Sequence, residues 1–180
     1  MKWIKPVAIL LFSLLVIGGA LAHPLWGDEA ETALFGRNIL KCGVPCGWDG
    51  TNIMGLNDAV VLNSKLVNHT SPWGQYYLVA LSFKFFGESD FSARLPFVIL
   101  SIFRLWLLYL VVKKMAGERS GTLALLITSV YIPQILYSFQ SRYYAINRFG
   151  GILIFWAVLN LLEAKKVWPK VLFVLGSVVY

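Results

Sequence analysis

Charged residues are scarce in this 180-residue chain, at 14% of the sequence, whereas 58% of the residues are hydrophobic. Soluble domains average about 25% charged and about 45–50% apolar residues. The mean hydropathy of +0.68 agrees with the shortage of charge. This composition excludes an ordinary soluble domain and predicts an integral membrane protein. We find no low-complexity linker and no internal repeat, so we expect one transmembrane domain over residues 1–180.

Acidic residues are fewer than basic ones, 9 against 16, which gives a net charge of +7. A basic chain suits nucleic acid when its Lys and Arg residues form a stripe on one face. Here many basic residues occur instead as pairs at the ends of apolar runs: Lys2 and Lys5, Lys113 and Lys114, Lys165 and Lys166. Such pairs fix the orientation of a chain in a bilayer. We therefore expect a membrane partner and no nucleic acid.

Cysteine and histidine are also rare, with two of each. Cys42 and Cys46 stand close together in CGVPC, but His23 and His69 are not near them in sequence. A structural zinc site needs four such ligands, so this spacing disfavours one. Outside the cytoplasm the two cysteines are able to form a disulfide. Two unpaired thiols are the alternative.

The apolar runs predict an all-α fold, a polytopic bundle of transmembrane helices. A spanning helix needs about 20 residues. We expect spans over 6–22, 95–112, 121–139 and 145–162, and a truncated span over 167–180. The last run is cut off at Tyr180, which indicates an N-terminal fragment of a longer protein. The first run has a competing interpretation as a signal peptide, because Ala20-Leu21-Ala22 resembles a cleavage site. Both interpretations put residue 23 onward outside the cytoplasm.

Residues 23–71 form the longest polar segment of the chain, and we expect a large external loop over 23–94 with short juxtamembrane helices. Its apolar stretch over 73–86 is too short to span a bilayer and predicts an interfacial helix. If this stretch does not span, the acids near residue 28 and the polar loop over 140–148 share the outer side. The positive-inside rule favours the same topology. Arg104, in the middle of a predicted span, must face other helices or water, as a functional residue or in an ion pair.

Two polar clusters then meet at the outer membrane surface. One offers the carboxylates Asp28 and Glu29, and a carboxylate suits a general base. The other offers Arg142, Tyr144, Asn147 and Arg148, and arginine grips a phosphate at two points. This pairing predicts group transfer from a lipid phosphate. Two plainer interpretations stand beside it. One is an interfacial set of salt bridges, and the other is Asp28 as an N-cap with Glu31 completing a capping box.

Three stretches resemble the GT-C membrane glycosyltransferases, in particular glycosyltransferase family 39. GDEAETALFGRNILKCGVPCGWDGTN (27–52) resembles the first external loop, where an Asp-Glu pair follows the first helix. SPWGQYYLVALSFKFFGESDFSARLPFVIL (71–100) resembles the long block that ends in ARLP. YSFQSRYYAINRF (137–149) resembles the pattern of the second external loop. Relatives in this family are the dolichyl-phosphate-mannose–protein mannosyltransferases and the bacterial aminoarabinose transferases of lipid A.

The resemblance implies an inverting transfer from a polyprenyl-phosphate sugar to a protein, lipid or glycan acceptor on the non-cytoplasmic face. By matched position, Asp28 is the acid-base residue or orients the acceptor, Glu29 is its motif partner, and Arg142 helps to hold the donor phosphate. We expect an integral membrane protein of a bacterial or archaeal plasma membrane rather than of the endoplasmic reticulum. No cofactor is identified, and a divalent metal stays an open alternative.

Departures from the aminoarabinose branch put that specificity in doubt. In that branch the second block opens with a lysine, and this chain has Ser71 at the position. The branch has an arginine three residues after the first acid, where this chain has Glu31. An aspartate of its second external loop corresponds to Asn147. Asparagine is able to bind a metal or a hydroxyl but cannot act as a base. The alternative function is a non-catalytic membrane protein such as a transporter subunit, in which Arg104 and Arg142 line a path and Asp28 caps a helix.

Overall fold

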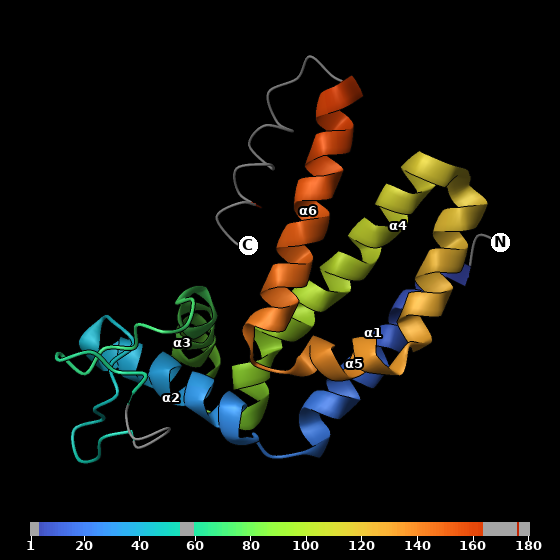
Figure 1. Ribbon diagram of the computed structural model, residues 1–180. Coiled ribbons are helices and arrows are strands. Elements are labelled where there is room, and N and C mark those ends of the chain that lie inside the picture. Colours follow the sequence, from blue (N-terminus) through green and yellow to red (C-terminus); the bar gives the residue numbers. More distant parts are fainter. Residues whose placement is uncertain (1–3, 55–59, 164–175, 177–180) are drawn as a thin grey trace. The chain divides into compact units, whose positions relative to one another are not determined.

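The structure, a computed structural model, describes residues 4–54, 60–163 and 176. This part of the chain is helical and holds only isolated bridges of β type. The helices are α1 (Ile4–Ala22), α2 (Gly27–Cys42), α3 (Gly74–Phe86), α4 (Asp90–Val130), α5 (Ile132–Phe139) and α6 (Tyr143–Glu163) (Figure 1). The predicted all-α membrane bundle is confirmed. The predicted run over 167–180 lies outside the described residues apart from Gly176.

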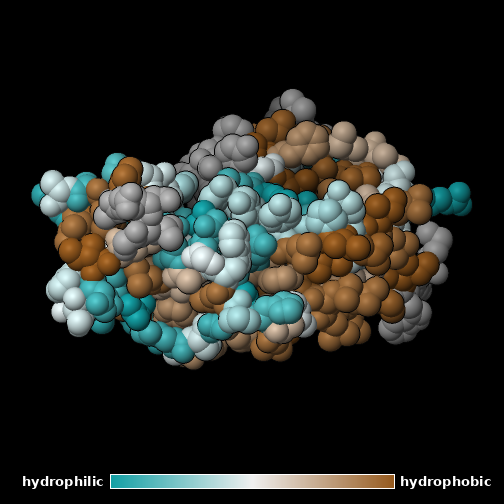
Figure 2. Space-filling view, turned by 60° about the horizontal axis from the view of Figure 1, so that its bottom comes forward, coloured by the Kyte–Doolittle hydropathy of each residue, from teal (hydrophilic) through white to brown (hydrophobic). Residues whose placement is uncertain are grey.

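The chain divides into two compact units. The membrane unit comprises Met1–Ala22, Phe97–Gln140 and Tyr144–Tyr180, and the loop unit comprises His23–Pro96 and Ser141–Tyr143. Among the described residues, three helices are long and apolar enough to cross a membrane: Ile4–Ala22, Asp90–Val130 and Tyr143–Leu161. In Figure 2 the visible face of the membrane unit is largely hydrophobic, whereas that of the loop unit mixes hydrophobic and hydrophilic areas.

Helix α4 reverses direction at Gly117, whose φ of 86° is accessible to glycine at little cost (Figure 1). The arms on either side of this reversal cover residues 90–116 and 118–130. They approach closely at Gly121, where a Cβ atom would lie 3.0 Å from the backbone oxygen of Tyr109. The predicted span over 121–139 falls on the second arm and on α5. The break lies at Tyr131, and α5 begins with Pro133 in its first turn, where proline is well tolerated.

Helices α2 and α3 pack against each other in the loop unit. Their core contains Phe35, Ile39, Tyr76 and Ala80, with the rings of Phe35 and Tyr76 4.9 Å apart. Gly36 makes this packing possible, since a Cβ atom there would lie 2.6 Å from Cγ1 of Val79 and 3.2 Å from the backbone oxygen of Tyr76. The external loop therefore has a folded helical core of its own.

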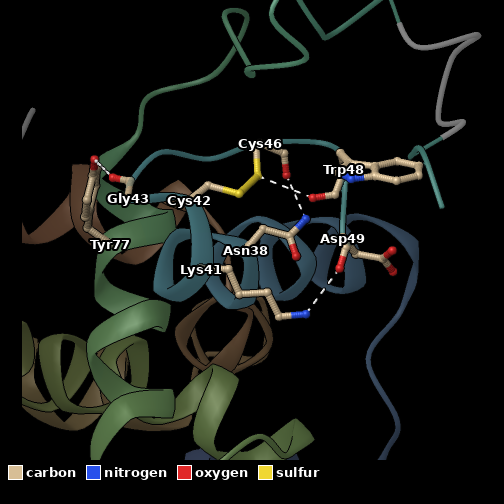
Figure 3. Close-up of a disulfide and its surroundings, with 8 residues drawn as sticks. All are labelled: Asn38, Lys41, Cys42, Gly43, Cys46, Trp48, Asp49 and Tyr77. Atoms are coloured by element: carbon tan, nitrogen blue, oxygen red, sulfur yellow. Dashed lines mark hydrogen bonds between the residues drawn. A yellow bond between two sulfur atoms is a disulfide. The ribbon is translucent and has the colours of Figure 1, made fainter. Parts of the chain in front are cut away.

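Cys42 and Cys46 form a disulfide at the end of α2, where Gly43 takes a left-handed φ of 75° (Figure 3). This resolves the choice that the spacing left open. The buried amide of Asn38 donates to the backbone oxygen of Cys46 at 2.7 Å. The hydroxyl of Tyr77 on α3 donates to the oxygen of Gly43 at 3.0 Å. The disulfide and these bonds hold the chain that leaves α2 against both helices.

The close approach at Gly36 gives a stability test. We expect Gly36→Ala to lower the free energy of unfolding by about 1–3 kcal/mol, because the new methyl group overpacks against Val79 and a backbone oxygen. Thermal unfolding of the purified protein in detergent measures this. Gly27→Ala in the same helix is the control, since no atom lies within 4 Å of its Cβ position. An unchanged or higher unfolding temperature for Gly36→Ala contradicts the packing described here.

Candidate functional site

Helix α2 begins one residue before Asp28, with Trp26 as its N-cap residue. Glu29 occupies the third helical position, and its carboxylate accepts a hydrogen bond from the backbone N–H of Trp26 at 3.4 Å. The interpretation of Asp28 as the N-cap, with Glu31 as its capping-box partner, is therefore wrong. Because the helix starts at Gly27 rather than after Asp28, the carboxylates of Asp28 and Glu31 are free of capping roles and bind other partners.

Both of these carboxylates contact Arg142. Nη2 of Arg142 lies 3.3 Å from Oδ2 of Asp28, and Nη1 lies 3.3 Å from Oε2 of Glu31. Nη1 also donates to the backbone oxygen of Asp28 at 3.3 Å. The side chain of Asp28 is 38% exposed, whereas those of Arg142 and Glu31 are 12% and 7% exposed. Asp28 is thus the more solvent-exposed acid of this cluster.

The buried carboxylate of Glu31 has a pKa raised above that of an ordinary glutamate, because burial penalises its charged form and Arg142 only partly offsets this. Tyr76 lies near the same cluster, with its ring packed on Phe35 one turn after Glu31. Burial raises the pKa of the Tyr76 hydroxyl, and the charge of Glu31 adds to the effect. The tyrosine is therefore a neutral phenol at physiological pH, able to donate a hydrogen bond.

Glu29 points into the interior of the loop unit and is fully buried. Arg94 binds it at two points, Nε to Oε1 at 2.9 Å and Nη2 to Oε2 at 2.5 Å. The backbone N–H of Ser141 donates to Oε1 of Glu29 at 2.9 Å. Arg94 also donates to the backbone oxygens of His23 and Pro24, at 2.6 and 3.0 Å. This one ion pair therefore joins three segments that are far apart in sequence.

The role of Glu29 follows from these contacts. Its carboxylate oxygens are already bonded to a guanidinium and to a backbone N–H, and they have no solvent-accessible surface. Such a group suits positioning better than proton transfer. Because the N–H that it binds belongs to Ser141, it fixes the residue next to Arg142. Sequence reasoning missed Arg94 as its partner, although Arg94 stands in the ARLP end of the long block that resembled the family.

The remaining predicted residues belong to the membrane unit. Arg148 donates to Oε1 of Gln134 at 3.3 Å, and its guanidinium lies 4.9 Å from the ring centre of Tyr137. The ring of Tyr144 stands edge-on to the same tyrosine at 5.2 Å. Asn147 is half-buried. The structure therefore brings Asp28, Glu29 and Arg142 together in one unit and places Tyr144, Asn147 and Arg148 in the other.

A metal site was left open by the sequence. In the described ranges, no group of three or more His, Cys, Asp and Glu side chains is arranged to hold a metal ion. Asp28 and Glu31 share Arg142, whose positive charge opposes a cation between them. These residues do not fit a metal ion, and we derive no step through one.

A family model described as dolichyl-phosphate-mannose-protein mannosyltransferase matches residues 70–179, more than half of the chain. The chain belongs to this family. The resemblance to GT-C membrane glycosyltransferases of the mannosyltransferase type is thereby confirmed. The comparison with curated proteins and the comparison with solved structures each returned no match. The range matched by the mannosyltransferase family model includes Arg94 and Arg142. It begins after α2, so any role of the acids on α2 is argued from the geometry alone.

The Glu29–Arg94 pair leads to a sharp prediction on stability. We expect Arg94→Met to lower the free energy of unfolding by about 3–5 kcal/mol, because the carboxylate of Glu29 is left buried without its cation. The double variant Glu29→Gln/Arg94→Met should recover part of this loss. The control is Arg37→Met, which breaks the half-exposed pair with Asp49 and should cost about 1 kcal/mol or less. Equal losses for Arg94→Met and Arg37→Met would refute the assigned role.

The raised pKa of Glu31 gives a prediction with a definite sign. The folded protein holds the Glu31 proton more tightly than the unfolded chain, so stability falls as the pH rises through this pKa. Glu31→Gln imitates the protonated form. We expect it to unfold at a higher temperature than the parent at neutral pH, and the two proteins to converge in acid.

Asp49 serves as a control with the opposite sign, since hydrogen bonds from the backbone of Asn52 and Thr51 lower its pKa. Asp49→Asn should be less stable than the parent at neutral pH, and this difference should also vanish in acid. Unfolding temperatures of the parent and both variants, measured from acid to neutral pH, test the direction of each stability difference. A Glu31→Gln variant that is less stable than the parent at neutral pH is inconsistent with this account.

Proposed function

We propose that this mannosyltransferase-family protein transfers a sugar from a polyprenyl-phosphate donor to an acceptor hydroxyl or amine, with inversion at the sugar carbon. Asp28 is the proposed general base, and Arg142 holds the donor phosphate. The observation that carries this proposal is the contact between Asp28 and Arg142, which are 114 residues apart in sequence. A partly exposed carboxylate beside a buried guanidinium offers the two functions that such a transfer needs.

The proposed reaction is a single displacement. Asp28 accepts the proton of the acceptor, and the acceptor atom attacks the anomeric carbon from the face opposite the phosphate. The bond between that carbon and the phosphate oxygen breaks, and the polyprenyl phosphate leaves with the electron pair. A carboxylate in this role accelerates transfer by about 10²–10⁴-fold.

Arg142 retains a hydrogen-bond donor for the phosphate. Its Nη1 and Nη2 atoms are bonded to α2, whereas its Nε atom is buried and makes no hydrogen bond within the described residues. A guanidinium stabilises the negative charge that develops on a leaving phosphate. Glu29 and Arg94 contribute indirectly by holding the N–H of Ser141, so we assign them as positioning residues. Tyr144, Asn147 and Arg148 stay predictions for the donor side.

The lipid part of the donor requires a membrane setting, which the three long apolar helices provide. We propose that the reaction takes place at the non-cytoplasmic face, in a bacterial or archaeal plasma membrane. The disulfide in the loop unit supports that side, since disulfides persist in oxidising compartments. The acceptor is a protein, a lipid or a glycan.

Asp28→Asn tests the proposed base. We expect turnover of polyprenyl-phosphate mannose, measured as release of polyprenyl phosphate per inserted protein, to fall by about 10²–10⁴-fold. Membrane insertion and the unfolding temperature should stay close to those of the parent. Glu88→Gln is the matched control, because Glu88 is an exposed acid of the same unit. If Asp28→Asn keeps the parent's turnover, Asp28 is not the base and the non-catalytic alternative gains support.

A further inference from the structure

The membrane unit contains a buried polar network in which three helices meet. The hydroxyl of Ser101 on α4 donates to the backbone oxygen of Ser138 on α5 at 3.0 Å. The amide of Gln134 donates to the hydroxyl of Ser138 at 2.8 Å. Arg148 on α6 donates to Oε1 of Gln134 at 3.3 Å. Ser101, Gln134 and Ser138 are all buried, so the network lies inside the apolar bundle.

Two arginines are associated with this network. Arg148 is held by Gln134 and lies over the ring of Tyr137, so its guanidinium is fixed in place. Arg104 follows Ser101 by one helical turn on α4, and Arg148 is the charged group that acts on it. The Nη1 atom of Arg104 is buried and makes no hydrogen bond within the described residues. The hydrogen bonds of this network connect Arg148 on α6 to the turn of α4 that carries Arg104.

The acids of this unit lie far along the chain from the two arginines. These acids are Glu118 and Glu163. Glu118 pairs with Lys5 and Lys113, and 14 residues of mainly helical chain, about 20 Å, separate it from Arg104. Glu163 lies 15 residues beyond Arg148 along α6, about 22 Å away. Among the described residues no ion pair forms to either arginine. Like charges at membrane depth without a counter-charge are strongly unfavourable, so the two arginines favour an anionic partner that the described residues of this unit do not supply.

We propose that Arg104 and Arg148 form a binding site for a lipid-linked phosphate. A guanidinium binds phosphate oxygens at two points, and two guanidiniums suit the charge of a phosphate ester. A phosphate attached to a hydrocarbon chain stays at the membrane, whereas a soluble anion must be drawn out of water. Two sources share this chemistry, the polyprenyl-phosphate donor and a membrane phospholipid. The donor as occupant rests on the proposed function, but binding of a lipid phosphate does not.

The test measures lipid binding to the purified protein. Undecaprenyl phosphate and phosphatidylglycerol are titrated separately, and the bound fraction is read by native mass spectrometry. We expect Arg104→Gln and Arg148→Gln each to weaken binding of one or both lipids by about 10- to 100-fold, and Arg104→Lys to weaken it less. Lys114→Gln is the matched control, since Lys114 is a cation of the same helix that donates to Asn160.

A second measurement covers effects on folding. Without added lipid, Arg104→Gln should unfold at a temperature equal to or above that of the parent, because it removes the repulsion between the two arginines. Addition of lipid phosphate should raise the unfolding temperature of the parent but not that of Arg104→Gln. A lower lipid-free unfolding temperature for Arg104→Gln would overturn the proposal, since it would mean that Arg104 has a counter-charge within the protein.

The outcomes separate the two lipid sources and the two proposals. If the two glutamine variants lose binding of undecaprenyl phosphate alone, the donor is the occupant. If they lose binding of phosphatidylglycerol, alone or in addition, the occupant is a phospholipid phosphate. Unchanged affinity for both lipids overturns the site. Glu88→Gln should bind both lipids as the parent does, because Glu88 is an exposed acid of the loop unit. If Asp28→Asn keeps full turnover, the proposed base fails while the result at Arg104 stands.

Discussion

The buried ion pair between Glu29 and Arg94 is the interaction on which the loop unit depends. It joins the chain before α2, the first turn of α2, the start of α4 and the backbone of Ser141. An isolated buried charge costs several kcal/mol, so neither residue is tolerated without the other. The geometry is specific as well, because a guanidinium with five donors and a carboxylate with two acceptors fix the directions of approach. Glu29 also holds the backbone N–H of Ser141, the residue next to Arg142.

Much of the architecture is visible in the sequence, because membrane helices and polar loops differ sharply in hydropathy. The stretch around Asp28 and the loop of Arg142 were expected on one side of the membrane, and the two residues are in contact in the loop unit. The break at Tyr131 was not located, since hydropathy alone does not place a break within a mainly apolar run. Pro133 indicated only that the helix is interrupted nearby.

The partners within the site were less predictable than the helices. Arg94 lies 65 residues from Glu29, and no local pattern indicates which acid a buried arginine will meet. Asp28 and Glu31 were also difficult to interpret, because Ser, Asp and Glu near a helix start suit capping and chemistry equally well. The start of α2 decides between these roles, and helix boundaries shift by one or two residues with little change in sequence pattern. Tertiary contacts therefore had to supply the assignment.

The reversal of α4 at Gly117 has a consequence for how the chain enters the membrane. The two arms and the short turn between them form a helical hairpin, with Lys113, Lys114 and Arg119 gathered at its tip. A hairpin of this kind inserts as one element, since separating its arms exposes the polar backbone at the turn to lipid. By the positive-inside rule, we expect the sidedness of this hairpin to depend on one compact cationic tip rather than on charges spread along the chain.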